Sequence, residues 1–260
     1  MLSGKWRIQR WFERESSVDV SERDGVRSLH LGSSTVQSSM KLSDPVELVL
    51  SYTRAMMAFL LFAPRPKHVV MIGLGGGSLA KFVYHRIDGA RTTVVENNPR
   101  VIAAARQYFF VPEDDERLKV ELGDGEEWIA RNPESCDVLM LDGYDGHNQV
   151  QTLSTEDFYA SARSALDPTG ILVANLWSSD RRFDTYLQRI ESVFPTVVCV
   201  PAERHGNVAV LAFNRPPRTT RWAVLRAEAR ELEATYGLEF MRMVEGMRRL
   251  NPHSDRDLTV

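Results

Sequence analysis

From His68 to Phe213, apolar runs of strand length alternate with segments whose apolar residues recur at helical spacing. This alternation is typical of a parallel sheet covered by helices on both faces. The expected strands are 68–73, 91–96, 118–123, 136–142 and 170–177, with helices at 77–87, 99–109, 125–131, 155–166 and about 181–193. Two further apolar runs, 196–202 and 207–213, are separated by a short polar stretch and predict an antiparallel hairpin at the sheet edge.

The segments on either side of this region have different patterns. Residues 16–32 alternate apolar and polar positions around Asp24-Gly25, which predicts a hairpin turn within a small N-terminal β region. Ser43-Asp44-Pro45 then predicts the start of a helix that runs to about Phe62, because an oxygen cap and a first-turn proline both favour a helix start. Residues 219–250 are amphipathic and predict a packing or dimer-contact helix pair.

The resulting fold class is α/β, a Rossmann-like sheet flanked by helices. Its expected divisions are an N-terminal β region (1–43), a Rossmann-like catalytic domain (44–216) and a C-terminal helical extension (217–260).

Composition narrows the classes of partner. The chain has 260 residues and a formal net charge of -3, which argues against a general binder of nucleic acid or of a membrane surface. The apolar stretch 55–63 is too short to cross a bilayer, and the N-terminus is too charged for a signal peptide. Cys136 and Cys199 lie inside apolar runs and are expected to be buried thiols, which indicates a reducing compartment, the cytoplasm. The expected partners are therefore small molecules or protein.

A glycine-rich turn is the first candidate for chemistry. Gly73, Gly75 and Gly77 follow one strand and open a helix, so the turn can bring backbone amides close to a nucleotide. A tight turn without a ligand would use glycine as well. Glu96 ends the next strand, where a carboxylate can accept both hydroxyl protons of a ribose. Together these residues predict a nucleoside site, without yet separating a nicotinamide dinucleotide from an adenosyl-sulfonium.

The choice between the two depends on Asp124 and Gly125 at the end of the third strand. An acidic residue there can accept from an adenine amino group, and with the terminal hairpin it favours the methyltransferase-type sheet that binds adenosylmethionine. The alternative role of Asp124 is a helix N-cap, which it can fill at the same time.

Two carboxylates end the fourth strand. Asp142 and Asp145 lie where open α/β sheets bind their ligands, and the apolar run before Asp142 predicts a buried charge that benefits from a nearby cation. Two aspartates three residues apart also make turn hydrogen bonds, which is the alternative. The six histidines are scattered and no Cys/His spacing matches a metal site, so no metal is expected.

At this level the chain resembles the spermidine synthases, the polyamine aminopropyltransferases. The resemblance runs from about Ser17 to Phe213 and includes VQSS, PRPKHVVMIG, VVENNPRVIAAARQYF, VELGDGEEWI, DVLMLDGYD and STEDFYASARSALDPTGILV. The family's strand-end motif is Asp-Ser-Ser/Thr-Asp-Pro, and residues 142–146 keep both of its carboxylates.

The resemblance implies a role for each candidate residue. Glu96 would bind the ribose, Asp124 the adenine, and Asp142 would accept a proton from the attacking amine or orient it. Asp145 would bind substrate beside Asp142, and Gln37 would contribute to the same site. The implied donor is decarboxylated S-adenosylmethionine and the implied acceptor is putrescine or a related small amine, with no metal. The resemblance also implies a homodimer.

The chain departs from the family at three places. Gly76 stands where the family has the Asp that contacts the amino end of the donor; Ser51-Tyr52-Thr53 replaces Tyr-His/Gln-Glu, and residues 202–206 replace Tyr-Pro-Ser-Gly. Glu203 and His205 are candidates for a substitute pocket, or else exposed hairpin residues. Two alternatives to aminopropyl transfer therefore stay open: an S-adenosylmethionine-dependent methyltransferase and a non-catalytic family member.

Overall fold

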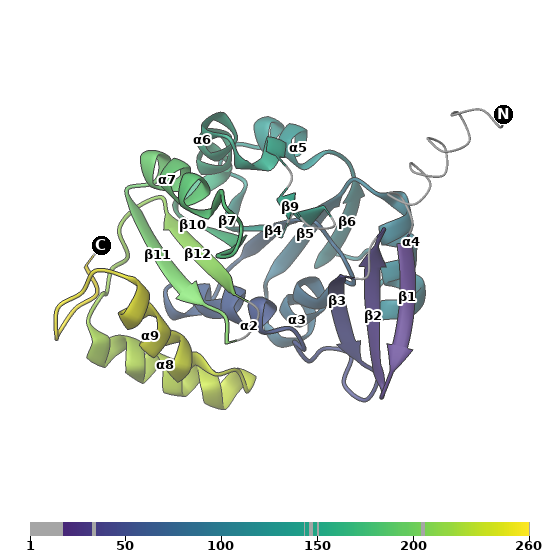
Figure 1. Ribbon diagram of the computed structural model, residues 1–260, viewed down its shortest axis with the longest axis horizontal. Helices are drawn as coiled ribbons and strands as arrows, with labels where there is room; N and C mark the ends of the chain where they lie inside the picture. The colour runs from purple at the N-terminus through teal and green to yellow at the C-terminus, as the bar shows by residue number, and fades with distance from the viewer. Residues whose placement is uncertain are drawn as a thin grey trace.

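A seven-stranded sheet forms the centre of the computed structural model, in which residues 18–32, 35–142, 144–145, 148–149, 151–203 and 206–259 are described (Figure 1). Its strands are β4 (His68–Ile72), β5 (Arg91–Glu96), β6 (Leu118–Leu122), β7 (Cys136–Leu141), β10 (Leu166–Trp177), β11 (Thr196–Pro201) and β12 (Asn207–Phe213). They are arranged in the order β11-β12-β10-β7-β4-β5-β6. The five strands from β10 to β6 are parallel, whereas β12 is antiparallel to both β10 and β11. The predicted α/β sheet and its edge hairpin are therefore confirmed.

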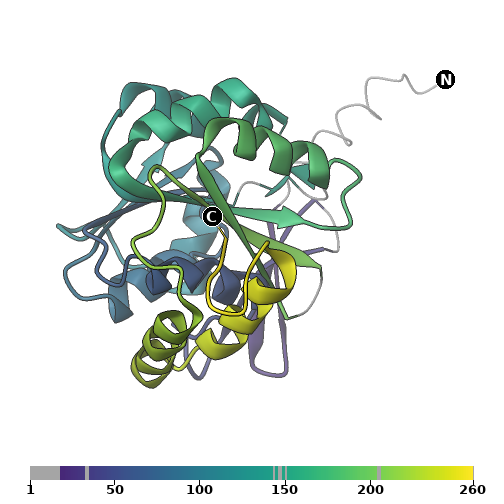
Figure 2. The same cartoon turned by 90° about the vertical axis from the view of Figure 1, so that its left-hand side faces the viewer.

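Helices cover both faces of this sheet. They are α2 (Ser51–Met56), α3 (Ser78–Arg86), α4 (Pro99–Phe109), α5 (Gly125–Arg131), α6 (Glu156–Ala165), α7 (Phe183–Val193), α8 (Trp222–Tyr236) and α9 (Phe240–Leu250). Figures 1 and 2 show α5, α6 and α7 on one face and α2, α3, α8 and α9 on the other.

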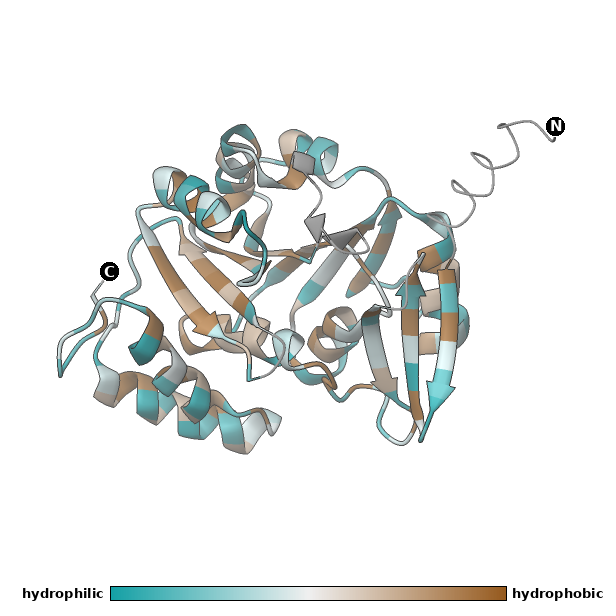
Figure 3. Cartoon of the chain, in the orientation of Figure 1, coloured by the Kyte–Doolittle hydropathy of each residue, from teal (hydrophilic) through white to brown (hydrophobic). Residues whose placement is uncertain are grey.

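Alternate residues of each central strand enter different cores. In β4, Val69 and Met71 belong to the cluster with α2, α3 and α9, whereas Val70 and Ile72 belong to the cluster with α6 and α7. A strand with period-two side chains and two covered faces must be apolar on both, which explains the continuous apolar runs of the sequence. The brown strands in Figure 3 show this pattern.

A separate three-stranded antiparallel sheet lies at the β6 end of the molecule (Figure 1). It contains β1 (Val18–Arg23), β2 (Val26–Leu31) and β3 (Val36–Lys41), with Asp24 and Gly25 at positive φ in the predicted turn. Lys81 of α3 is buried behind this sheet and donates to the carbonyl oxygen of Phe109 at 2.7 Å. Burial lowers the pKa of this lysine to about 8, because the interior disfavours its charge.

One predicted helix start was wrong. The helix expected from Ser43-Asp44-Pro45 begins at Ser51, as α2, and continues into a 3-10 helix, η1 (Met57–Leu61). The Asp44 carboxylate accepts from the amide of Val46 at 3.2 Å, and the Asp44 carbonyl accepts from Glu47. These short-range bonds make a turn, the common alternative to a cap for an aspartate followed by proline.

The C-terminal helices α8 and α9 both pack on η1, and α9 also packs on the edge strand β11. Asn251, which follows α9, is 8% exposed and bonds both backbone groups of Cys199: its side-chain oxygen accepts from the amide at 2.7 Å, and its side-chain nitrogen donates to the carbonyl at 2.8 Å. A single amide thus covers part of an open strand edge. No helix in the part of the chain that the structure describes is long and apolar enough to cross a membrane.

The Asn251 contacts predict a stability effect. Asn251→Ala leaves both backbone groups of Cys199 without their side-chain partner and is expected to lower the free energy of unfolding by about 1–3 kcal/mol. Asn132→Ala is the matched control, because the Asn132 amide donates only within one helix turn, to Trp128. Urea unfolding of the three proteins measures the difference; equal losses in both variants would show that Asn251 does not fix the edge.

Candidate active site

The candidate site lies at the carboxyl edge of the parallel strands. The turn between β4 and α3 contains Gly73, Gly75 and Gly77, whose φ angles are 95°, 53° and 67°. Residues with side chains rarely adopt these values, so the turn depends on glycine at these positions. Glu96 ends β5 and Asp142 follows β7, the two neighbours of β4. The sheet therefore brings these sequence-predicted residues to the same edge.

Glu96 is engaged with the backbone of the glycine turn. One carboxylate oxygen accepts from the amide of Leu74 at 2.9 Å and the other from the amide of Asn98 at 2.9 Å. The side chain is buried, and this burial raises the pKa of Glu96 while the amide hydrogen bonds oppose the rise. Each carboxylate oxygen has two lone pairs, so the group can accept further hydrogen bonds from a ligand.

Asp142 is held from two sides by neutral donors. Its Oδ1 accepts from Asn175 Nδ2 at 3.0 Å, and its Oδ2 lies 3.1 Å from the hydroxyl of Tyr52, which donates to it. Burial raises the pKa of Asp142, and the two hydrogen bonds oppose this rise. The pKa of Tyr52 is also raised, first by burial and then by the carboxylate. The pair therefore contains one proton acceptor, Asp142, and a tyrosine that stays protonated at neutral pH.

The hydrogen-bond chain continues behind Asp142. The side-chain oxygen of Asn175 on β10 accepts from Asn207 Nδ2 on β12 at 2.9 Å, and both asparagines are buried. With its nitrogen donating and its oxygen accepting, the Asn175 amide has one orientation only. These hydrogen bonds join four residues from four elements into one chain, which we call the relay: Asn207, Asn175, Asp142 and Tyr52.

Gln37 and Ser38 approach the site from the N-terminal sheet. The Tyr52 hydroxyl lies 3.2 Å from the Gln37 carbonyl oxygen, and a cavity of about 20 Å³ is lined by Gln37, Ser38, Tyr52 and Asp142 together with the glycine turn. Ser38 is buried and its hydroxyl is 3.1 Å from that of Ser78, the first residue of α3. The structure thus brings Gln37, the turn and Asp142 together.

Asp124 and Gly125 lie further along the same edge. Asp124 Oδ1 accepts from the amide of Glu127 at 3.0 Å, so the N-cap role is observed, and the exposed side chain is free on its outer side to meet a ligand. A Cβ at Gly125 would lie 2.4 Å from Ile72 Cγ2, so this position needs glycine for packing against β4. Neither observation tests a contact with adenine.

For Asp145 the structure describes the backbone but not the side chain. It lies in the short strand β8 (Tyr144–Asp145), which pairs with β9 (Asn148–Gln149). His205 lies outside the described residues. Among the residues that the structure describes, no group of three or more His, Cys, Asp or Glu side chains could hold a metal ion.

The sequence analysis did not identify three members of the relay. Asn175 is an amide inside the apolar run ILVANLW, and Asn207 is the polar first residue of NVAVLAF. A polar residue in a strand buried on both faces is itself a signal, because it must find a partner. Tyr52 lies in one of the segments that depart from the family, but its residue type gave no further signal, because a tyrosine in an apolar helix is common in cores.

Gly76, the position where the family has Asp, has no room for a side chain. A Cβ there would lie 2.7 Å from Ser38 Oγ and 2.9 Å from Phe109 Cδ1. Ser38 therefore occupies the space into which a residue at position 76 would project.

This crowding predicts a measurable coupling. Gly76→Ala is expected to cost about 1–3 kcal/mol of stability by overpacking. Ser38→Gly removes two of the three close atoms, so the double variant should lose less than the sum of the single variants. Chemical denaturation of all four proteins measures the coupling, and strict additivity would contradict it.

The raised pKa of Asp142 predicts a pH dependence. A carboxyl whose pKa is raised on folding contributes stability below its unfolded pKa, about 4, and loses that contribution as the pH rises through the folded value. Asp142→Asn removes the titration. The stability of this variant relative to wild type should therefore increase from about pH 4 towards neutral pH. Urea unfolding across this range is the measurement, and a difference that does not change with pH would contradict the prediction.

Known proteins of one family are similar to this chain over most of its length. Residues 49–215 match the model of the spermine/spermidine synthase domain. The chain is 43% identical over 255 residues to a polyamine aminopropyltransferase of Chromobacterium violaceum, covering 98% of both chains. It is 44% identical over 241 residues to a protein of the same name from Neisseria meningitidis, covering 92% of both.

Solved structures share the fold. A structure described as a probable spermidine synthase from Corynebacterium glutamicum has a TM-score of 0.72 at 19% identity, covering 93% of this chain and 95% of that one. The structure of human methyltransferase-like protein 13 in complex with SAH has a TM-score of 0.65 at 25% sequence identity, covering 79% of this chain and 96% of that one. The structure of a spermidine synthase in complex with the transition-state analogue AdoDATO has a TM-score of 0.63 at 21% sequence identity, covering 88% of this chain and 84% of that one.

Proposed function

Because the chain belongs to the spermine/spermidine synthase family, we propose that it transfers an aminopropyl group from decarboxylated S-adenosylmethionine to putrescine or a related small amine. The observation that carries this function is Asp142, a half-buried carboxylate at the carboxyl end of β7, held by Tyr52 and Asn175 beside the glycine turn. The enzyme is accordingly a transferase of the aminopropyltransferase class.

The reaction needs a neutral amine. An alkyl amine with a pKa near 10 is protonated at neutral pH and must lose a proton before its lone pair can attack. In the transfer a C–N bond forms at the carbon next to the sulfonium, the C–S bond breaks, and its electron pair stays on sulfur as methylthioadenosine leaves. One proton of the attacking nitrogen is released, and Asp142 would accept it.

The surroundings of Asp142 suit this role. Burial raises its pKa, which strengthens it as a base, while Asn175 and Tyr52 hold its two oxygens in fixed directions. Both partners donate to the carboxylate, so neither takes its proton. The negative charge also attracts a cationic amine into a partly buried position.

The donor would be held by the other residues at the edge. The backbone of Gly73, Gly75 and Gly77 would line it, and Glu96 would accept from the ribose hydroxyls. Asp124, with Gly125 shaping the turn before α5, would lie at the adenine. Gln37 and Asp145 would contribute to substrate binding. The positive φ angles of the turn and the inward carboxylate of Glu96 support this arrangement.

The methyltransferase alternative is not favoured, because relatives at 43% and 44% identity that span nearly the whole chain are named aminopropyltransferases. The absence of a carboxylate at Gly76 makes donor selectivity the sharpest test of the choice. Calorimetric titration should show tighter binding of the decarboxylated donor than of S-adenosylmethionine; a clear preference for the carboxylated molecule would instead favour methyl transfer.

Quaternary structure, domain organisation and location are further parts of the proposal. We propose a homodimer in the cytoplasm, with an N-terminal β region (1–43), a catalytic domain (44–216) and a C-terminal extension (217–260). The family resemblance supports the dimer. Two free cysteines support a reducing compartment: burial raises the pKa of Cys136 to about 12 and that of Cys199 to about 11, so both thiols stay protonated.

Activity assays with the decarboxylated donor and a panel of di- and polyamines test the function directly. Wild-type protein should form methylthioadenosine and an aminopropylated amine. Asp142→Asn should lower kcat by about 10²–10⁴-fold, because it removes the proton acceptor while keeping the shape. Tyr52→Phe, which removes one hydrogen bond, should lower kcat by a smaller factor. Wild-type protein that binds the donor but gives no product with any amine would contradict the proposal.

A further inference from the structure

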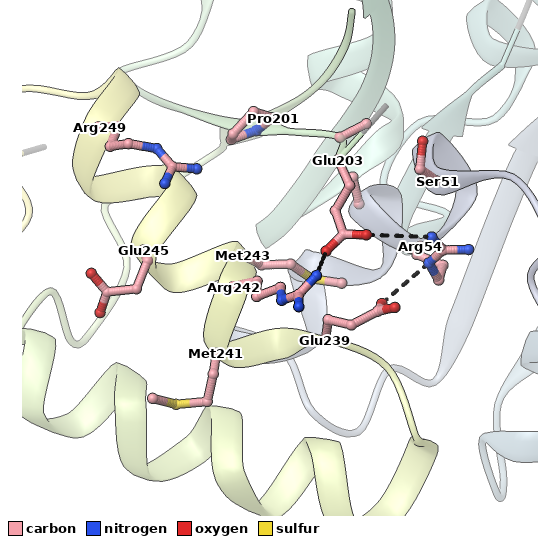
Figure 4. A pocket seen from close by; sticks show the side chains of 12 residues that line it. Ser51, Arg54, Pro201, Glu203, Glu239, Met241, Arg242, Met243, Glu245 and Arg249 are labelled. Carbon is pink, nitrogen blue, oxygen red and sulfur yellow. Dashed lines mark hydrogen bonds and ion pairs between the residues drawn. The ribbon is translucent and has the colours of Figure 1, made fainter. Parts of the chain in front are cut away.

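Four charged side chains form a cluster beside α2, which we call the Arg54 cluster: Arg54, Glu203, Glu239 and Arg242 (Figure 4). Arg54 Nε is 3.1 Å from a carboxylate oxygen of Glu239, and an Arg54 terminal nitrogen is 3.8 Å from Glu203. Arg242 donates to the other oxygen of Glu203. Three elements therefore meet through ion pairs: α2, the β11–β12 hairpin and α9 with its N-cap Glu239.

Arg54 also holds the chain that precedes α2. Its Nη1 donates to the carbonyl oxygens of Leu48 at 2.9 Å and Val49 at 3.0 Å. The side chain is 19% exposed, and its nitrogens face the two carbonyls and two carboxylates named above. A planar guanidinium with five donors can serve all of these acceptors together, whereas a lysine ammonium cannot.

The space around the cluster makes these ionic contacts important. An open pocket of about 680 Å³ lies between α2, residues 201–203 and α9, with Arg54, Glu203 and Glu239 in its lining. Ala55 of α2 and Met243 of α9 belong to one apolar core beside this pocket. The ion pairs of Arg54 add a polar link between α2 and α9 on the side that faces the pocket.

Two residues of the cluster lie close in the chain to residues whose hydrogen bonds hold Asp142. Tyr52, which donates to Asp142, lies two residues before Arg54 in α2. Asn207, which orients Asn175 and through it Asp142, lies four residues after Glu203 in the hairpin. The hairpin is at the carboxyl edge, because the antiparallel register pairs Asn207 with Trp177 at the end of β10.

The sheet order indicates which substrate this side of the site would meet. The glycine turn and Glu96 are at β4 and β5, so in the proposed reaction the donor would occupy the half of the edge towards β6. A displacement at carbon requires the nucleophile to approach opposite the leaving sulfur. The amine would therefore approach from the half formed by β10, β12 and β11, the half that carries Glu203 of the Arg54 cluster.

We propose that the Arg54 cluster is a positioning device for the amine side of the site, with Arg54 linking the C-terminal helix α9 to the hairpin and to Tyr52. This inference rests on the proposed aminopropyl transfer. The four residues do not touch the reacting atoms in this scheme; they fix the elements that carry Tyr52 and Asn207.

The kinetic test uses Arg54→Met, which keeps most of the side-chain volume and removes every ionic contact. We expect the KM for the amine to rise about fivefold or more and kcat to fall by a smaller factor, because Tyr52 and Asn207 hold Asp142, while the KM for the donor should change less than about twofold. Arg54→Lys, which keeps the charge but not the fork, should lie between wild type and Arg54→Met.

The matched control is Arg226→Met. Arg226 pairs with Glu245 at 2.9 Å, joins α8 to α9 and is 28% exposed. Its side-chain bond goes to Glu245 and not to α2 or to the described residues of the hairpin. The Arg226→Met variant should have the same KM for the amine as wild type. An unchanged KM for the amine in Arg54→Met, an equally large rise in the KM for the donor, or the same effect in Arg226→Met would each overturn the inference.

Hydrogen–deuterium exchange tests the cluster without an activity assay. The Ala202 amide donates to the Asn207 carbonyl at 2.9 Å, and the Thr53 amide donates to Leu50, so peptides with these amides report on the hairpin and on α2. Both should exchange faster in Arg54→Met and not in Arg226→Met; unchanged exchange would overturn the inference. If wild-type protein transfers no aminopropyl group, the proposed function fails, and exchange alone decides whether the cluster positions these elements.

Discussion

The half-buried carboxylate of Asp142, with its two hydrogen bonds, is the interaction on which the arrangement of the site depends. An ionised carboxylate away from water is costly unless donors replace the lost hydration, and here Asn175 and Tyr52 supply them. These donors come from β10 and α2, so α2 must dock against the end of the sheet for Asp142 to be satisfied. Asn207 adds a third requirement, because it fixes which way the Asn175 amide faces. The catalytic proposal and the packing of four elements thus share one set of hydrogen bonds.

The donor half of the edge is organised by close approach. Ser38 and Phe109 lie so close to Gly76 that a Cβ would not fit there. Ile72 crowds Gly125 in the same way. β3 can approach the glycine turn closely for this reason, and the Ser38 hydroxyl reaches Ser78. The departure from the family at position 76 is therefore part of a local repacking in which Ser38 fills the space. Gln37, Tyr52 and Asp142 line the same small cavity. In the proposed function, donor selectivity would come from groups such as these.

The amine half is organised by charge. Arg54 stands in the helix next to the residues that replace the family's Tyr-His/Gln-Glu, and its partners come from the hairpin and from α9. The C-terminal helices thus have a packing role, through Asn251 on the edge of β11, and a connection to the site, through Glu239. The sequence pattern predicts only a packing role for this amphipathic helix pair, whereas the ion pair of Glu239 with Arg54 also joins it to α2.

The sequence by itself determined the parallel sheet, its edge hairpin and the positions of Gly73, Glu96 and Asp142, because apolar periodicity and turn chemistry are local and parallel strands bring their carboxyl ends to one edge. It misplaced the start of α2, where two local patterns of Asp44 competed. Only the tertiary structure decided that Tyr52, Asn175 and Asn207 serve Asp142, that Ser38 fills the space beside Gly76, and that Arg54 joins the hairpin to α9. Such partners lie 30 to 150 or more positions apart in the chain, and their pairing follows from packing, which no local pattern records.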